Sequence, residues 1–300
     1  MAAPRSRADM WFGVYLPQLR MQFDTIVERT LAAESAGFDS VWLMDHLAAP
    51  AAPEFDTLEG WTLAAALTAR TATIRIGHLV TADPFRHPAL LAKMVATVDQ
   101  ISNGRLELGL GWGSVPQELT MYGYPDESNA TRAARMRESV QIIRAMCAGE
   151  RFDHHGEFFT LSNAIGRPVP VQQPVPLHIG GAGPQLTMPL VREYADWWNC
   201  PCYAADQLAD LAPLAAPARI SVQRPIGLVI DPTARDDVVA TAHKRYAGWG
   251  GLVTGSAREI VDALQRDAEL GVEGWILQFS DFGQPETLQT FIRDVVPQLR

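Results

Sequence analysis

Short apolar runs alternate with longer stretches of helical periodicity from one end of the chain to the other. Most of the short runs are apolar at successive positions, which is typical of parallel strands that are covered on both faces. We predict eight such strands, over residues 11–16, 40–44, 74–80, 106–110, 176–180, 197–200, 226–230 and 275–279. The alternation indicates an α/β protein built on a parallel sheet.

The longer stretches predict helices that follow the strands in turn. We expect them over residues 24–35, 59–71, 89–101, 130–146, 185–194, 207–214, 236–246 with 257–270, and 286–295. Typical boundary residues support them, because Gly37 follows the first helix and Pro88 begins the third. Ser256 stands three residues before Glu259, which is the spacing of a capping box.

Eight strand–helix units in 300 residues fit a (β/α)₈ TIM barrel. An open, doubly wound sheet is the structural alternative, because periodicity does not distinguish a closed sheet from an open one. No linker-like change in composition separates the units. We therefore expect one domain over residues 11–300 and a disordered N-terminal tail over residues 1–10.

Composition narrows the class of protein. With 47% hydrophobic and 20% charged residues, the chain can bury a sizeable core. Its net charge of −9 gives no general attraction for nucleic acid or an anionic membrane, so we expect neither as a partner. We find no signal peptide and no apolar run long enough to span a membrane. Three cysteines are too few for a disulfide framework, which indicates the cytoplasm.

In a TIM barrel, the residues of the active site lie in the loops that follow the strands. Asp45 and His46 end the second strand, where an imidazole can move a proton near neutral pH. The alternative is that Asp45 caps the loop and His46 is a solvated surface residue. Two glycine-rich segments, 109–113 and 180–183, permit close approach to a ligand, and the second precedes a helix whose N–H groups suit a phosphate. A tight turn and simple packing beneath a helix are their alternative explanations.

Other polar groups give weaker signals. Cys200 and Cys202 lack a second pair of ligands, so we expect no metal site. His154 and His155 lie in a polar segment and are interpreted as a solvated pair in a loop. The arginines at 132, 135 and 137 are interpreted as one solvated face of a helix. No nucleophile elbow, Walker A loop or zincin motif is present.

Several segments together resemble the luciferase-like monooxygenase superfamily. They are residues 37–46 (GFDSVWLMDH), 75–81 (RIGHLVT), 86–94 (RHPALLAKM), 99–111 (DQISNGRLELGLG), Glu118 with Tyr122 and Gly123, 179–184 (IGGAGP) and 194–199 (YADWWN). The match runs in order over nearly the whole chain and is clearest over residues 11–200. Met-Asp-His at 44–46 and Arg-His-Pro at 86–88 most resemble the branch that uses the deazaflavin coenzyme F420, rather than the branch that uses FMN.

The resemblance implies a bacterial luciferase-like barrel with a cofactor ring at the carboxyl ends of the strands. It implies that Asp45 contacts the polar edge of the ring and that His46 faces the substrate as proton donor or acceptor. Leu79 and Val80 match a bulge that contains a non-prolyl cis peptide in relatives and backs the ring. Gly111, Trp112, Gly113 and Gln117 would line the side chain of the cofactor, and Gly181, Ala182 and Gly183 its phosphate.

Two positions depart from the family pattern. Relatives tend to have a small residue at the place of Trp112 and an aromatic at the place of Ser114. Some also carry a glutamate near Ser114 that assists proton transfer, and this chain has none there. His46 is therefore the best single candidate for the proton relay.

The leading hypothesis is an F420-dependent oxidoreductase that transfers a hydride between the deazaflavin C5 and a small organic substrate. The bond reduced would be an activated C=C, C=N or C=O bond, or the reaction would run in reverse. One alternative is a two-component monooxygenase that uses reduced FMN and dioxygen. Another is a non-catalytic flavin-binding barrel whose pocket Trp112 fills. Resemblance alone implies a homodimer.

Overall fold

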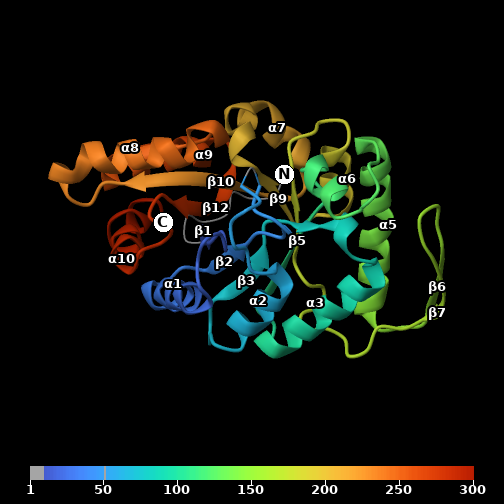
Figure 1. Ribbon diagram of the computed structural model, residues 1–300. Helices are drawn as coiled ribbons and strands as arrows, with labels where there is room; N and C mark the ends of the chain where they lie inside the picture. Colours follow the sequence, from blue (N-terminus) through green and yellow to red (C-terminus); the bar gives the residue numbers. More distant parts are fainter. Residues whose placement is uncertain (1–9, 51) are drawn as a thin grey trace.

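The structure is a computed structural model that describes residues 10–50 and 52–300 (Figure 1). The tail expected over residues 1–10 lies outside the described residues, apart from Met10. Eight parallel strands form the central sheet: β1 (Trp11–Tyr15), β2 (Ser40–Leu43), β3 (Arg75–His78), β5 (Leu106–Gly111), β8 (Leu177–Gly180), β9 (Trp197–Cys200), β10 (Arg219–Leu228) and β12 (Val272–Phe279). Pairing of β9 with β10 and of β12 with β1 closes the sheet. The TIM barrel is confirmed, and the open sheet is wrong.

Helices surround this barrel. They are α1 (Phe23–Ala36), α2 (Gly60–Thr68), α3 (Pro88–Ser102), α4 (Pro116–Met121), α5 (Asn129–Ala148), α6 (Thr187–Tyr194), α7 (Leu208–Ala215), α8 (Arg235–Tyr246), α9 (Ala257–Glu269) and α10 (Pro285–Asp294). Short 3₁₀ turns are η2 (Asp83–Phe85), η3 (Cys202–Gln207), η4 (Pro232–Ala234), η5 (Ala247–Trp249) and η6 (Val296–Gln298). Gly37 ends α1 in the left-handed conformation at φ 100°, and Ser256 with Glu259 forms the expected capping box of α9.

Four regions differ from the predicted elements. Strand β10 begins at Arg219, seven residues before the predicted run, because polar Ser221 and Gln223 interrupt its apolar pattern. Strand β11 (Val253–Gly255) extends the sheet beside the outer half of β10, and β4 (Thr81–Ala82) pairs with the end of β5. A hairpin of β6 (Phe152–His155) and β7 (Thr160–Ala164) stands apart from the barrel, where we expected a loop (Figure 1).

Aromatic side chains fill the amino-terminal part of the barrel. The ring of His178 stacks on Trp197 at 5.6 Å between centroids, and Trp11 stacks on the same imidazole at 5.8 Å. Glu107 Oε2 lies 2.7 Å from His178 Nε2, which satisfies one polar atom of this buried layer. Side chains thus fill the amino-terminal part of the barrel interior. The carboxyl end is the side where a ligand can bind.

No helix within residues 10–50 and 52–300 is both long and apolar enough to cross a bilayer.

Candidate functional site

A bulge after β3 crosses the carboxyl end of the barrel. The peptide bond between Leu79 and Val80 is cis, as the resemblance implies. Val80 reaches toward β5 and β8, where a Cβ on Gly111 would lie 2.6 Å from Val80 Cγ2 and one on Gly180 would lie 3.0 Å from Cγ1. A Cβ on Gly109 would lie 1.9 Å from the carbonyl oxygen of His78. The glycines of β5 therefore leave space for the bulge. They do not serve the packing of a helix beneath the strand, which was the alternative explanation.

Asp45 anchors this bulge to β2. Its side chain is nearly fully buried, and its Oδ2 accepts a hydrogen bond of 2.8 Å from the backbone N–H of Ala82. Arg86 donates to both carboxylate oxygens, at 2.7 and 2.8 Å, and also to Glu59 at 2.7 Å. Burial lowers the pKa of Arg86, but the bonds to Asp45 outweigh it and the pKa ends above its ordinary value. Asp45 is thus the centre of a clamp, and its contact with a cofactor ring stays a prediction.

A second clamp fixes the backbone just before Asp45. The fully buried amide of Gln18 donates to the carbonyl of Met44 at 2.7 Å and accepts from the Met44 N–H at 3.1 Å. These two bonds join the loop after β1 to the end of β2. The direction in which Asp45 and His46 leave the strand is therefore set by both neighbours.

His46 lies against a glutamate that the sequence analysis gave no role. Its Nδ1 is 2.7 Å from Oε2 of Glu118, which α4 carries. The other oxygen of Glu118 accepts from the backbone N–H groups of Leu47 and Ala48, at 2.5 and 3.2 Å. Glu118 stands four residues after Ser114, and α4 brings its carboxylate to the imidazole, which the sequence alone did not predict.

The charge of Glu118 fixes the tautomer of His46. Burial raises the pKa of Glu118, but the bonds from His46 and the two backbone N–H groups outweigh it and leave the pKa below its ordinary value. An ionised carboxylate can only accept, so Nδ1 of His46 carries the proton. Among the residues that the structure describes, none hydrogen-bonds the second ring nitrogen, Nε2, and the side chain is 22% exposed. His46 is therefore neither a free surface residue nor a buried one, but an oriented imidazole.

The glycine loop and Trp112 meet at the start of α6. The indole N–H of Trp112 donates to Thr187 Oγ1 at 3.3 Å. Gly181 has φ 125°, and a Cβ there or on Gly183 would come within 3.2 or 3.3 Å of Thr187. Gly181, Ala182 and Gly183 are half-buried, whereas Gln117 is exposed on α4. The loop therefore needs its glycines to run into the helix this closely.

The interpretation of the arginines of α5 as one solvated face is wrong for Arg132. This side chain is buried, and its guanidinium carbon lies 5.4 Å from the centre of the Trp112 ring. Arg137, in contrast, is only half-buried and forms an ion pair with Glu193. The polar pattern of residues 130–146 does not show this difference in burial, because the pattern does not indicate which face of a helix packs against a loop.

A buried carboxylate lies beside α5 as well. Burial raises the pKa of Asp83 to about 6, although the neighbouring Ser139 hydroxyl and the charge of Arg135 lower it in part. A folded pKa above the ordinary 3.8 means that the folded protein binds this proton more tightly than the unfolded chain. The stability that this gives is complete below about pH 4 and is lost as the pH rises through about 6.

We therefore expect Asp83→Asn to remove a pH-dependent part of the stability. Between about pH 4 and pH 7 the wild type should lose about 2 kcal/mol relative to this variant, since one pKa unit corresponds to about 1.4 kcal/mol. Urea unfolding at the two pH values measures the difference. Asp153→Asn, on the exposed hairpin, is the control and should follow the wild type. Parallel pH profiles for the wild type and Asp83→Asn would contradict the assignment.

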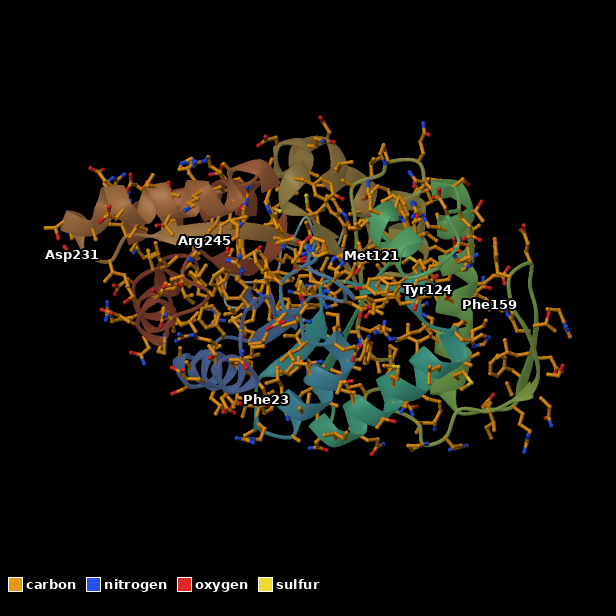
Figure 2. The ribbon with its side chains drawn as sticks, in the orientation of Figure 1. Phe23, Met121, Tyr124, Phe159, Asp231 and Arg245 are labelled. Carbon is orange, nitrogen blue, oxygen red and sulfur yellow. The ribbon has the colours of Figure 1, made fainter. Side chains whose placement is uncertain are left out.

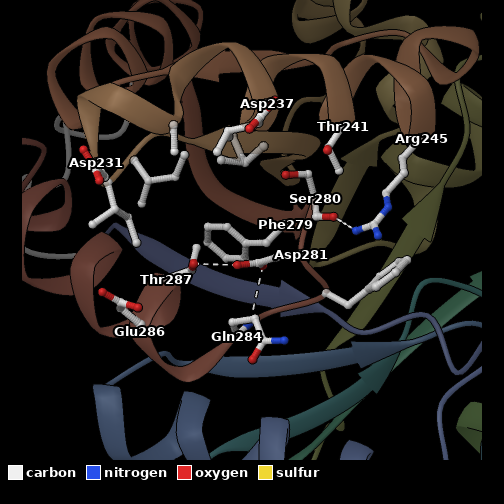
Figure 3. Close-up of a pocket in the computed structure, with 16 residues that line it drawn as sticks. Asp231, Asp237, Thr241, Arg245, Phe279, Ser280, Asp281, Gln284, Glu286 and Thr287 are labelled. Atoms are coloured by element: carbon white, nitrogen blue, oxygen red, sulfur yellow. Dashed lines mark hydrogen bonds between the residues drawn. The ribbon is translucent and has the colours of Figure 1, made fainter.

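A separate cavity lies away from these residues. It measures about 570 Å³ and opens between α8, α10 and the outer end of β10, with Asp237, Arg245 and Asp281 among its lining residues (Figure 3). The carboxylate of Asp281 is already hydrogen-bonded within the protein. It accepts from Thr287 Oγ1 at 2.5 Å and from the N–H of Gly283 at 3.0 Å. Asp231, another residue that lines this cavity, follows β10 and lies at one end of the molecule in Figure 2. Met121 of α4 lies near the middle of the same view. This cavity contains none of the predicted site residues.

Comparisons with known proteins show which proteins the chain resembles. The profile of the luciferase-like monooxygenase family matches residues 10–270. An F420-dependent glucose-6-phosphate dehydrogenase of Amycolatopsis mediterranei is 36% identical over 164 residues, which are 53% of this chain and 48% of that protein. The match therefore spans about half the length of that relative. An uncharacterized protein of Mycobacterium tuberculosis is 27% identical over 270 residues, 85% of each chain.

Solved structures with the same fold perform different reactions. An F420-dependent secondary alcohol dehydrogenase, in complex with an F420-acetone adduct, superposes with a TM-score of 0.81 at 21% identity, over 97% of this chain and 99% of that chain. A monooxygenase from Streptomyces bottropensis gives the same TM-score and identity, over 97% and 100%. At this identity both show the fold and leave the reaction open.

Proposed function

Because the chain belongs to the luciferase-like monooxygenase family, we propose that it is an oxidoreductase that uses coenzyme F420. The similarity of about half of the chain to an F420-dependent dehydrogenase supports this choice of cofactor. The reaction we propose is hydride transfer between the deazaflavin C5 and a small organic substrate, with His46 moving the accompanying proton. The observation that carries the proposal is the His46–Glu118 pair at the carboxyl end of β2.

The residues at the barrel mouth fit a flavin-type cofactor. Leu79 and Val80 form a half-buried platform that glycines of β5 and β8 support from below. In this proposal Gly111 and Gly113 line the side chain of the cofactor, and the loop 181–183 receives its phosphate. When bound, the deazaflavin supplies the carbon that carries the hydride, and the protein supplies orientation and a dry environment.

The pair gives His46 a defined direction of proton transfer. With its proton on Nδ1, the neutral imidazole offers Nε2 as an acceptor for the proton of an alcohol or amine that is being oxidised. In the reverse direction the protonated ring donates from Nε2. The carboxylate of Glu118 stabilises the imidazolium in either case and so acts as a positioning residue.

Replacing Glu118 with Gln tests this arrangement. The amide can still accept from Leu47 and Ala48, but its NH₂ group then donates to Nδ1 and moves the proton of the neutral ring to Nε2. We expect kcat to fall by about 10- to 100-fold with KM and cofactor affinity within about twofold. Glu150→Gln removes the same charge at an exposed position and should leave kcat unchanged. An unchanged kcat in Glu118→Gln would contradict the positioning role.

The monooxygenase neighbour makes oxygen dependence the test that separates the two enzymatic hypotheses. We expect the protein to oxidise reduced F420 with an unsaturated or carbonyl substrate in the complete absence of oxygen. A panel of activated C=C, C=N and C=O compounds, followed by the return of the oxidised deazaflavin absorbance, measures this. Turnover only with reduced FMN and dioxygen would contradict the proposal. The single domain over residues 11–300, the homodimer and the cytoplasmic location stay predictions.

A further inference from the structure

A second cavity lies between the outer wall of the barrel and two helices. The helices are α3 and α5, which contact each other along the outside of the barrel (Figure 1). The cavity measures about 360 Å³, which is within the range of about 300–1,000 Å³ that small-molecule sites occupy. Aliphatic side chains that are at most 4% exposed line it: Val95, Leu108, Leu110, Val140, Ile143 and Leu177.

This cavity is separate from the barrel mouth. Leu108 and Leu110 of β5 line the cavity, whereas Gly109 and Gly111 of the same strand lie against Val80 of the bulge. Successive residues of a strand point to opposite faces of the sheet. The cavity therefore lies behind β5, on the far side of the strand from the platform that we propose for the cofactor.

Arg144 supplies positive charge at the mouth of the cavity. It is an exposed lining residue whose Nη2 donates to the carbonyl of Tyr194, whereas its Nε and Nη1 donate to none of the described residues. The amide of Gln173, another exposed lining residue, makes no side-chain hydrogen bond to a described residue either. None of the described residues that line the cavity is acidic. The charge at the mouth therefore favours an anionic group over an amine.

We propose that this cavity is a binding site for a medium-chain aliphatic monocarboxylate, with its chain along the aliphatic wall and its carboxylate on Arg144. An apolar cavity of about 150 Å³ already takes up benzene, because apolar solutes gain contacts there that water cannot replace. The larger volume here accommodates a longer chain, and the exposed mouth keeps the carboxylate partly hydrated beside a cation. The site goes beyond the proposed function and does not depend on which cofactor the protein binds.

The first experiment separates the carboxylate from the chain. Calorimetric titrations use octanoate and octanol, with octanoate below its micellar concentration. We expect Arg144→Met to bind octanoate about 5- to 20-fold more weakly and octanol within about twofold of the wild type. Arg192→Met removes the same charge from an exposed position on α6 and should bind both ligands like the wild type. Equal octanoate affinity in Arg144→Met and the wild type would overturn the assignment of the carboxylate.

Cys147 reports whether octanoate occupies this cavity, and the measurement needs no variant. The residue lines the cavity and is half-buried, and burial raises the pKa of its thiol to about 11. Iodoacetamide at mildly alkaline pH, with mass spectrometry of each cysteine, gives its alkylation rate. Octanoate at about ten times its dissociation constant should slow this reaction about 10-fold, and acetate should not. Failure of the wild type to bind octanoate, or an unchanged alkylation rate, would overturn the proposal.

A variant that fills the cavity completes the test. Cys147→Phe places a ring at the wall, and the thiol that it replaces makes no hydrogen bond to a described residue. We expect this variant to lose binding of both octanoate and octanol. Retained binding of both ligands would place their site elsewhere and contradict the proposal.

Discussion

Replacing His46 with Ala is expected to lower kcat by about 10²- to 10⁴-fold, the usual contribution of a positioned general acid or base. The imidazole is the group that Glu118 orients at the barrel mouth, and its Nε2 is left for the substrate. Cofactor affinity should stay within about twofold, because the glycine loop and the bulge are unchanged. Single-turnover hydride transfer under anaerobic conditions gives the rate, and a calorimetric titration gives the affinity.

His155→Ala is the matched control for this prediction. His155 is exposed on the β6–β7 hairpin, and its replacement should leave the rate unchanged. An unchanged rate in His46→Ala itself would mean that the proton moves by another route.

Replacing Arg86 with Met is expected to destabilise the fold by about 3–5 kcal/mol. Asp45 is buried, and the variant would leave its carboxylate without a cation in the interior. Urea unfolding near neutral pH measures the loss. Adding Asp45→Asn should restore a large part of it, because the neutral amide can still accept from the N–H of Ala82. A loss of less than about 1 kcal/mol in Arg86→Met would show that the clamp is not a stabilising element.

The barrel could be predicted from the sequence because most of its strands are continuously apolar. Strand β9 lies at 197–200, as its apolar Trp-Trp pair predicts. The predicted start of strand β10 lies too far along the chain, because its first part contains polar residues such as Ser221. Ser221 faces the barrel interior, where Asn199 donates a hydrogen bond to it. Periodicity detects burial against an apolar core, and a polar barrel interior escapes it.

The site was predictable only where its residues adjoin a strand. Asp45 and His46 follow β2 directly, so barrel logic found them. Glu118 lies 72 positions from His46, and only the fold brings the two together. Arg132 lies in a helix whose pattern is polar on several faces, so the sequence did not predict that this residue is buried beside Trp112.

The most direct test of the account is the identity of the cofactor that the purified protein binds. Parallel calorimetric titrations with oxidised F420 and with FMN, under identical buffer conditions, measure it. We expect F420 to bind at least about 10-fold more tightly than FMN, a difference of about 1.4 kcal/mol in binding free energy. Tight FMN binding with no detectable F420 binding would contradict it.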